Sequence, residues 1–211
     1  MRGTFISFEG GEGCGKSTQV RRLAARLEKM GRKVLVTREP GGTPLGETIR
    51  HLLKHSPQTD GVCPESELFL FAAARAQLVR SVILPALAKK MVVLSDRFHD
   101  STTVYQGMVR GVDPKLVAAI NWLAVGECVP RLTIVLDIPV AEGRRRLMRR
   151  VRPVGGERDR FEEEPLGFHR QVARGYLRLA EAEPKRIKVV DGRGTPDEVE
   201  AAIWEHVKHV L

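Results

Sequence analysis

The 211-residue sequence contains few cysteines, few aromatic residues and no long hydrophobic run. Its three cysteines, Cys14, Cys63 and Cys128, are widely spaced and form no CxxC pair, so we expect neither a disulfide framework nor a zinc site. The most apolar runs, such as 132–138, are too short to span a bilayer. The first residues also lack the basic region and apolar stretch of a signal peptide. We therefore expect a cytoplasmic protein that has no membrane partner.

Positive charge is in excess, with a formal net charge of +9. Much of it is concentrated in one segment, which contains Arg144, Arg145, Arg146, Arg149, Arg150, Arg152, Arg158 and Arg160. Aromatic residues make up only 5% of the chain, and no aromatic ladder is interleaved with these arginines, which disfavours single-stranded nucleic acid as the partner. A small polyanion fits the local charge at least as well. A basic nucleic-acid-binding protein without catalysis stays a distant alternative.

Short β-rich runs alternate with longer amphipathic stretches. We predict strands at 3–8, 33–37, 91–95, 132–137 and 186–190. We predict helices at 16–30, 44–54, 65–89, 113–126, 139–150, 166–182 and 196–209. Strands separated by helices imply an α/β fold, in which a five-stranded parallel sheet is covered by helices on both faces. The length suits a single domain over 1–211.

The sequence after the first predicted strand matches the phosphate-binding pattern GxxxxGK[ST]. The predicted ATP-binding residues are Gly10, Gly11, Glu12, Gly13, Cys14, Gly15, Lys16, Ser17 and Thr18. The glycines allow backbone N–H groups to approach the phosphates, while Lys16 reaches the β- and γ-phosphates and Ser17 is placed to ligate Mg²⁺. Chance would produce such a match in about one chain of this length in a hundred. Its place between a strand and a helix favours a P-loop NTPase fold.

Polar motifs follow the second and third predicted strands as well. Residues 38–42 read Arg-Glu-Pro-Gly-Gly, and residues 95–98 read Ser-Asp-Arg-Phe. Ligands bind at the carboxyl ends of strands in open α/β sheets. Asp96 is a plausible partner of Mg²⁺, together with Ser17. The guanidinium of Arg97 can face a phosphate bidentately.

Taken in order, five motifs closely resemble those of bacterial thymidylate kinases. They occupy residues 8–18, 38–43, 71–75, 96–107 and 159–162. The resemblance implies transfer of the γ-phosphoryl group of ATP to dTMP, giving dTDP and ADP in dTTP biosynthesis, with Mg²⁺ as the cofactor. It also implies a homodimer, formed through apolar helix faces within 65–89 and 113–126. A different P-loop nucleotide or deoxynucleoside kinase is the alternative, although a nucleoside acceptor would need a general base.

The resemblance further assigns roles at the acceptor site. The implied dTMP-binding residues are Glu12, Arg38, Pro40, Phe71, Arg75, Arg97, Ser101, Thr102, Tyr105 and Gln106. Phe71 would stack on thymine, and Arg75 would bond its carbonyl edge. Arg38 and Arg97 would hold the acceptor phosphate, while Glu12 would lie near the 3′-hydroxyl and the metal. Tyr105 would crowd the sugar 2′ position, and Thr102 and Gln106 would line the base pocket. Taken alone, Phe71 is more often a core residue.

The acceptor phosphate has a second pKa of about 6 and is already a nucleophile near neutral pH, so no general base is needed. Catalysis then consists of positioning and charge stabilisation. The P-loop contains no arginine, and relatives of that type supply arginine from a lid. We predict a mobile lid at about 149–160, flexible at Gly155-Gly156, in which Arg149, Arg150 and Arg152 act beside Lys16, Arg97 and Glu12. A solvated basic helix face is the alternative interpretation of this arginine run.

Overall fold

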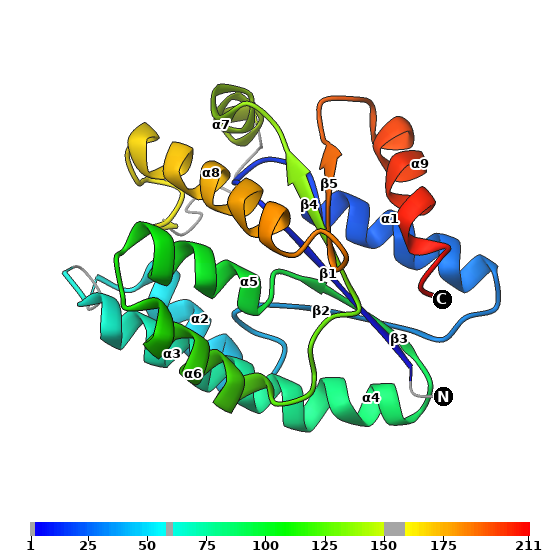
Figure 1. The fold of residues 1–211 in the computed structure, drawn as a ribbon, viewed down its shortest axis with the longest axis horizontal. Helices are drawn as coiled ribbons and strands as arrows, with labels where there is room; N and C mark the ends of the chain where they lie inside the picture. Colours follow the sequence, from blue (N-terminus) through cyan, green and yellow to red (C-terminus); the bar gives the residue numbers. More distant parts are fainter. Residues whose placement is uncertain (1–2, 58–60, 150–158) are drawn as a thin grey trace.

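A computed structural model of the chain describes residues 3–57, 61–149 and 159–211. Five parallel strands form one sheet in the order β2-β3-β1-β4-β5 (Figure 1). Their bounds are β1 Thr4–Gly10, β2 Val34–Arg38, β3 Val92–Asp96, β4 Leu132–Asp137 and β5 Ile187–Asp191. Each lies within about two residues of its predicted position, and the predicted α/β fold is confirmed.

The central strands β1, β3 and β4 read as apolar runs because helices cover both faces of the sheet. Ile6, Phe8, Leu94 and Ile134 are completely buried. In the parallel register Phe8 is level with Asp96, and Asp96 is level with Arg38 of β2. The carboxyl ends of three neighbouring strands therefore meet at one edge, where the predicted motifs begin.

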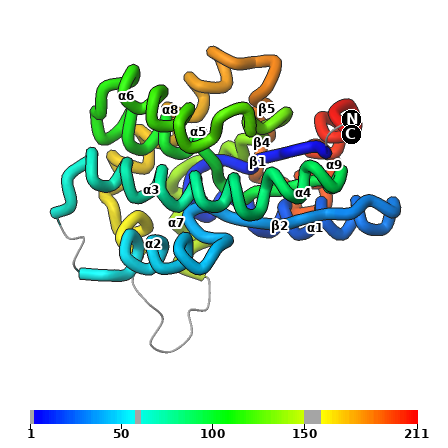
Figure 2. The backbone as a smooth tube through the Cα atoms, turned by 90° about the horizontal axis from the view of Figure 1, so that it is seen from below, coloured from blue at the N-terminus to red at the C-terminus, as the bar shows by residue number. Residues whose placement is uncertain are grey.

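Helices cover the sheet on both faces. On one face α1 (Lys16–Lys29) and α9 (Pro196–Val207) pack together against the strands. On the other lie α8 (Leu166–Ala182), α3 (Pro64–Leu78), the π-helical segment η2 (Val79–Ile83) and α4 (Leu84–Ala88). α3 and α4 run end to end along the sheet (Figure 2). The helices α2 (Pro44–His55) and α6 (Pro114–Val125) pack against α3, and α7 (Val140–Arg149) follows β4.

One helical segment was not predicted from the sequence. α5 (His99–Thr102) continues directly into the π-helical η3 (Thr103–Val109). The segment is short and contains Gly107, so it shows little of the periodicity that identifies a long helix. π-helical turns are rare and occur frequently at functional sites. Here the turn carries Tyr105 and Gln106, two of the predicted site residues.

Part of the predicted lid can be placed. Arg149 is the last residue of α7, and Asp159 and Arg160 lie where the chain approaches α2. The lid residues Arg150 and Arg152 lie outside the described residues, as do Gly155 and Gly156.

One described helical stretch, Pro64–Ala88, is long and apolar enough to cross a membrane, a feature that the sequence analysis did not identify. Length and composition are weak evidence, because core helices of other proteins pass the same test. This stretch also carries Glu67 and Arg75, both 1% exposed and paired with residues of neighbouring helices and loops. Its charged groups are therefore built into the protein's own interior.

Candidate active site

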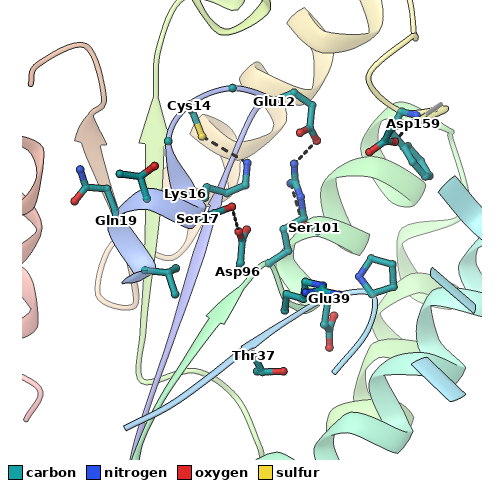
Figure 3. Close-up of a pocket in the computed structure, with 18 of the residues that line it drawn as sticks. Glu12, Cys14, Lys16, Ser17, Gln19, Thr37, Glu39, Asp96, Ser101 and Asp159 are labelled. Carbon is teal, nitrogen blue, oxygen red and sulfur yellow. Dashed lines mark hydrogen bonds and ion pairs between the residues drawn. The ribbon is translucent and has the colours of Figure 1, made fainter. Parts of the chain in front are cut away.

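A cleft of about 1220 Å³ opens at the carboxyl ends of the strands. Figure 3 shows the Ser17 side chain of the P-loop pointing toward Asp96 at the end of β3, with Ser101 of α5 nearby. The predicted residues that line the cleft are Glu12, Gly13, Cys14, Gly15, Lys16, Ser17, Thr18, Arg38, Pro40, Phe71, Asp96, Arg97, Ser101, Thr102, Tyr105, Gln106 and Arg149. Residues separated by more than 130 positions thus share one cavity.

The P-loop has the backbone geometry that its glycines suggest. Gly13 and Gly15 have φ angles of 71° and 99°, which side chains disfavour. A Cβ at Gly13 would lie 2.2 Å from the carbonyl oxygen of Gly143 in α7, and a Cβ at Gly143 would lie 2.4 Å from the backbone carbonyl oxygen of Glu12. The two glycines therefore allow α7 to pack directly on the loop.

Two P-loop side chains already have hydrogen-bond partners, Lys16 within the loop and Ser17 at the end of β3. The Lys16 ammonium donates hydrogen bonds to the carbonyl oxygens of Gly10, at 3.1 Å, and Gly11, at 2.8 Å. The Ser17 hydroxyl donates to the Asp96 carboxylate at 2.5 Å. Mg²⁺ prefers oxygen ligands. The Ser17 hydroxyl and the Asp96 carboxylate supply two of them side by side. The pair Ser17 and Asp96 therefore fits a magnesium ion.

Arg97 and Glu12 form an ion pair across the cleft floor. Arg97 also donates to the Gly10 carbonyl at 3.2 Å and to the Ser101 hydroxyl at 3.3 Å. Burial alone raises the pKa of the Glu12 carboxyl, but Arg97 and Lys16 outweigh it and lower that pKa to about 2. Glu12 is thus an anion that holds a cation at the junction of the P-loop and β3.

Glu9 is a functional candidate that the sequence analysis did not single out. Its carboxylate accepts the Phe98 backbone N–H at 2.8 Å, the Ser101 hydroxyl at 2.6 Å and the Tyr176 hydroxyl at 2.8 Å. Burial, with a contribution from Asp100, raises the pKa of Glu9 to about 7. A carboxylate inside an otherwise apolar strand was the signal in the sequence. Ser101 and Tyr176 both also accept hydrogen bonds from Arg97. Glu9 therefore holds the two hydroxyl groups that position the Arg97 guanidinium.

Arg75 lies beneath the cleft wall, at 1% exposure, and is not among the residues that line it. Its guanidinium donates to Glu39 at 2.8 Å, Asn121 at 3.0 Å and Thr102 at 2.9 Å. Glu39 is buried as well, and this burial raises the pKa of its carboxyl. Arg75 therefore links α3 to α6 and to the end of α5. Its predicted contact with a base stays a prediction.

At the far end of the cleft the chain that follows the lid packs on the predicted base pocket. The Phe161 ring contacts the rings of Phe71 and Tyr105 edge-on, with centroids 5.8 and 6.1 Å apart. Lys54 of α2 pairs with Asp159 at 2.5 Å. Phe161, which follows the predicted lid, thus contacts the predicted base pocket, and Asp159 within the predicted lid contacts α2.

The remaining predicted arginines differ in how they are held. Arg38 is half exposed and pairs with Glu47 at 2.8 Å, so its guanidinium sits at the cleft rim. Arg149 is exposed at the end of α7. Arg146, one turn earlier, also lines the cleft and donates to the Gly192 carbonyl at 3.0 Å. The described part of the arginine segment therefore reaches the P-loop side of the cavity.

A P-loop that faces an arginine-lined second site across one cleft defines a kinase of the P-loop NTPase fold. The thymidylate kinase family model matches residues 8–203, and the chain belongs to that family. It is 52% identical to the thymidylate kinase of Syntrophotalea carbinolica over 98% of this chain and 96% of that one. It is 51% identical to the enzyme of Geobacter sulfurreducens, over 94% and 92%. A crystal structure of thymidylate kinase from Ehrlichia chaffeensis has a TM-score of 0.77 and 30% identity, covering 99% of both chains.

The raised pKa of Glu9 predicts a pH-dependent stability. A carboxyl whose pKa rises from 4.5 to about 7 on folding favours the folded state while it is protonated, and that contribution is lost as the pH rises through 7. Relative to Glu9→Gln, the wild type should lose about 3 kcal/mol of unfolding free energy between pH 4.5 and 8, measured by urea denaturation. Glu12→Gln is the matched control, because a pKa of about 2 lies outside this window. Equal pH dependence in wild type and Glu9→Gln would contradict the assignment.

Proposed function

We infer that this protein transfers the γ-phosphoryl group of ATP to dTMP and so produces dTDP and ADP for dTTP synthesis. Its membership of the thymidylate kinase family supports this substrate pair. The observation that carries the proposal is the Glu12–Arg97 ion pair, which joins the P-loop to the cation of the second site. The cytoplasm remains our expectation for the location.

Both substrates are polyanions, and the reaction requires that they be held close together. The acceptor phosphate is largely a dianion near neutral pH and can attack without a general base. Lys16 can exchange its two carbonyl partners for β- and γ-phosphate oxygens, which form stronger charge-assisted hydrogen bonds. Arg97 is held on several sides by Gly10, Glu12 and Ser101, so its position is largely fixed before dTMP binds. Preorganised cations of this kind stabilise the transferring group without reorganisation.

We propose Mg²⁺ as the cofactor, held by Ser17 and Asp96. The 2.5 Å hydrogen bond between these side chains brings two oxygen ligands together beside the P-loop. When bound, the ion neutralises charge on the β- and γ-phosphates. Glu12 stays paired with Arg97 and faces the acceptor side.

The dTMP site that we propose extends from Arg97 along the α5–η3 segment. Arg38, Pro40 and Ser101 contribute at its phosphate end, and Phe71 supplies an aromatic face for the base. The Tyr105 hydroxyl lies 3.5 Å from the Glu12 carboxylate, which supports a place for both near the sugar. Thr102 and Gln106 line the base pocket, and Arg75 acts from beneath Thr102.

A comparison of acceptors tests this proposal. In a coupled assay with ATP, kcat/KM should be far higher for dTMP than for thymidine, because the arginines at the site require a phosphate. Faster turnover of thymidine than of dTMP would instead indicate a deoxynucleoside kinase. Salt-dependent DNA binding without ATP turnover would favour the nucleic-acid-binding alternative.

We propose that Arg149, Arg150 and Arg152 belong to a closing lid that brings a guanidinium to the transferring phosphoryl group. The support is that Arg149 lines the cleft and the P-loop carries no arginine. Alanine at the lid arginine that acts should lower kcat by roughly a hundredfold or more, with a modest change in dTMP binding. Arg145→Ala is the matched control, because this exposed arginine of α7 pairs with Glu142. Near-normal kcat in all three single variants and in the triple variant would exclude the lid role.

We also propose a homodimer, formed through α3 and α6. The packed pair exposes large apolar side chains, namely Phe69 at 57%, Leu116 at 42%, Trp122 at 73% and Leu123 at 69%. An exposed apolar patch of this kind marks an interaction surface. Sedimentation should show a dimer that Trp122→Lys converts to a monomer. Met30→Lys, on the exposed end of α1, should leave it dimeric; a monomeric wild type would refute the proposal.

A further inference from the structure

Glu67 of α3 is a buried carboxylate on which three side chains converge. It is 1% exposed and accepts a hydrogen bond from the Gln106 amide nitrogen at 2.8 Å. Its other oxygen accepts from the Arg160 guanidinium at 2.6 Å, and Arg110 lies 3.5 Å away. Two cations therefore hold this carboxylate in place behind the wall of the cleft.

This contact determines which end of the Gln106 amide faces the cleft. An amide has a donating nitrogen and an accepting oxygen of nearly equal shape, and its orientation follows from its hydrogen-bond partners. A carboxylate flanked by two guanidinium groups can only accept, so the nitrogen must turn toward Glu67. Gln106 lines the cleft, and no donor among the described residues bonds its oxygen. Glu67 thus makes Gln106 present an acceptor.

The neighbouring Thr102 is fixed in the opposite sense. It lies four residues before Gln106 and also lines the cleft. Arg75 donates to the Thr102 hydroxyl oxygen at 2.9 Å, and since Arg75 has no acceptor, the hydroxyl hydrogen is left to donate. Two buried charged networks therefore set a donor at Thr102 and an acceptor at Gln106 on one wall.

We propose that Glu67 is a positioning residue that makes the kinase selective for pyrimidines carrying a hydrogen on N3. Thymine and uracil offer an N3–H donor next to the O4 acceptor, which complements Gln106 and Thr102. Cytosine offers the reverse, an N3 acceptor next to an amino donor. Its N3 would then face the Gln106 oxygen, and its amino group would face the Thr102 hydroxyl hydrogen. The inference rests on the proposed function, because it takes dTMP to bind in this cleft.

The test compares three acceptors in the wild type and in Glu67→Gln, at saturating ATP. A neutral amide at position 67 can donate or accept, so the amide of Gln106 is free to turn over. The kcat/KM for dTMP and dUMP should fall together by roughly tenfold or more, as expected when a buried hydrogen bond is lost. The value for dCMP should be unchanged or higher, and KM for ATP should not change. dUMP is the matched substrate, since it differs from dTMP only by the C5 methyl group.

Two further variants separate orientation from stability. Arg110→Met removes a cation from Glu67 but keeps the carboxylate beside Gln106, so it should lower the Tm and leave the dTMP-to-dCMP ratio as in the wild type. Gln106→Leu should by itself abolish the preference for dTMP over dCMP. Adding Glu67→Gln to this variant should then change the dTMP-to-dCMP ratio no further. Such coupling is not expected of a residue that only supports the fold.

Each outcome decides one point. An equal fall for all three acceptors in Glu67→Gln would make Glu67 merely structural and overturn the inference. A wild type that does not prefer dTMP over dCMP would contradict the proposed function and, with it, the inference that rests on it. If Glu67→Gln alone does not fold, the double variant with Arg110→Met, which leaves one fewer unpaired cation, is measured in the same way. A wild-type ratio in that variant would also overturn the inference.

Discussion

The ion pair between Glu12 and Arg97 is the interaction on which the rest of the site depends. Arg97 has a φ angle of 71°, a conformation that costs a residue with a side chain roughly 1–3 kcal/mol. The strain is compensated because the Arg97 backbone N–H bonds the Phe8 carbonyl while the guanidinium reaches Glu12 and Gly10. A bend at the end of β3 is thereby tied to the loop that follows β1. The proposed ATP side and the proposed dTMP side of the cleft are consequently positioned by one shared ion pair.

A second layer of buried carboxylates supports the side chains that face the cleft. Glu9 fixes Ser101 and Tyr176 behind Arg97, and Glu67 holds Gln106, while Glu39 holds Arg75 and itself lines the cleft. Each of these carboxylates is buried, and each accepts a hydrogen bond from a side chain that lines the cleft or lies directly beneath its wall. Breaking a buried pair by removing one partner leaves an uncompensated charge, so such residues are costly to replace. The buried carboxylates thus fix the orientation of the polar side chains in the cleft once the protein is folded.

The sequence predicted the parts of this structure that follow from local patterns. All five strands and the P-loop were predicted, because strand-helix alternation and the spacing of Gly10, Gly15 and Lys16 depend on neighbours in the chain. The helical segment from His99 to Val109 was missed, since it is short and partly π-helical. Glu9 and Glu67 were not assigned roles, because their partners lie as far as 167 residues away in the sequence. Only the tertiary structure shows which charged residues are buried beside the site.

Arg75 illustrates how tertiary context changes an interpretation that motif reasoning suggests. The resemblance assigns it to the thymine edge, yet most of its donors are engaged by Glu39, Asn121 and Thr102. A guanidinium has five N–H groups, so a direct bond to a base and the buried network are compatible. The larger consequence is indirect, since the bond from Arg75 leaves the Thr102 hydroxyl hydrogen free to donate. Selectivity at the base can therefore depend on charges that the substrate need not touch, because each charge permits only one orientation of the neutral group in front of it.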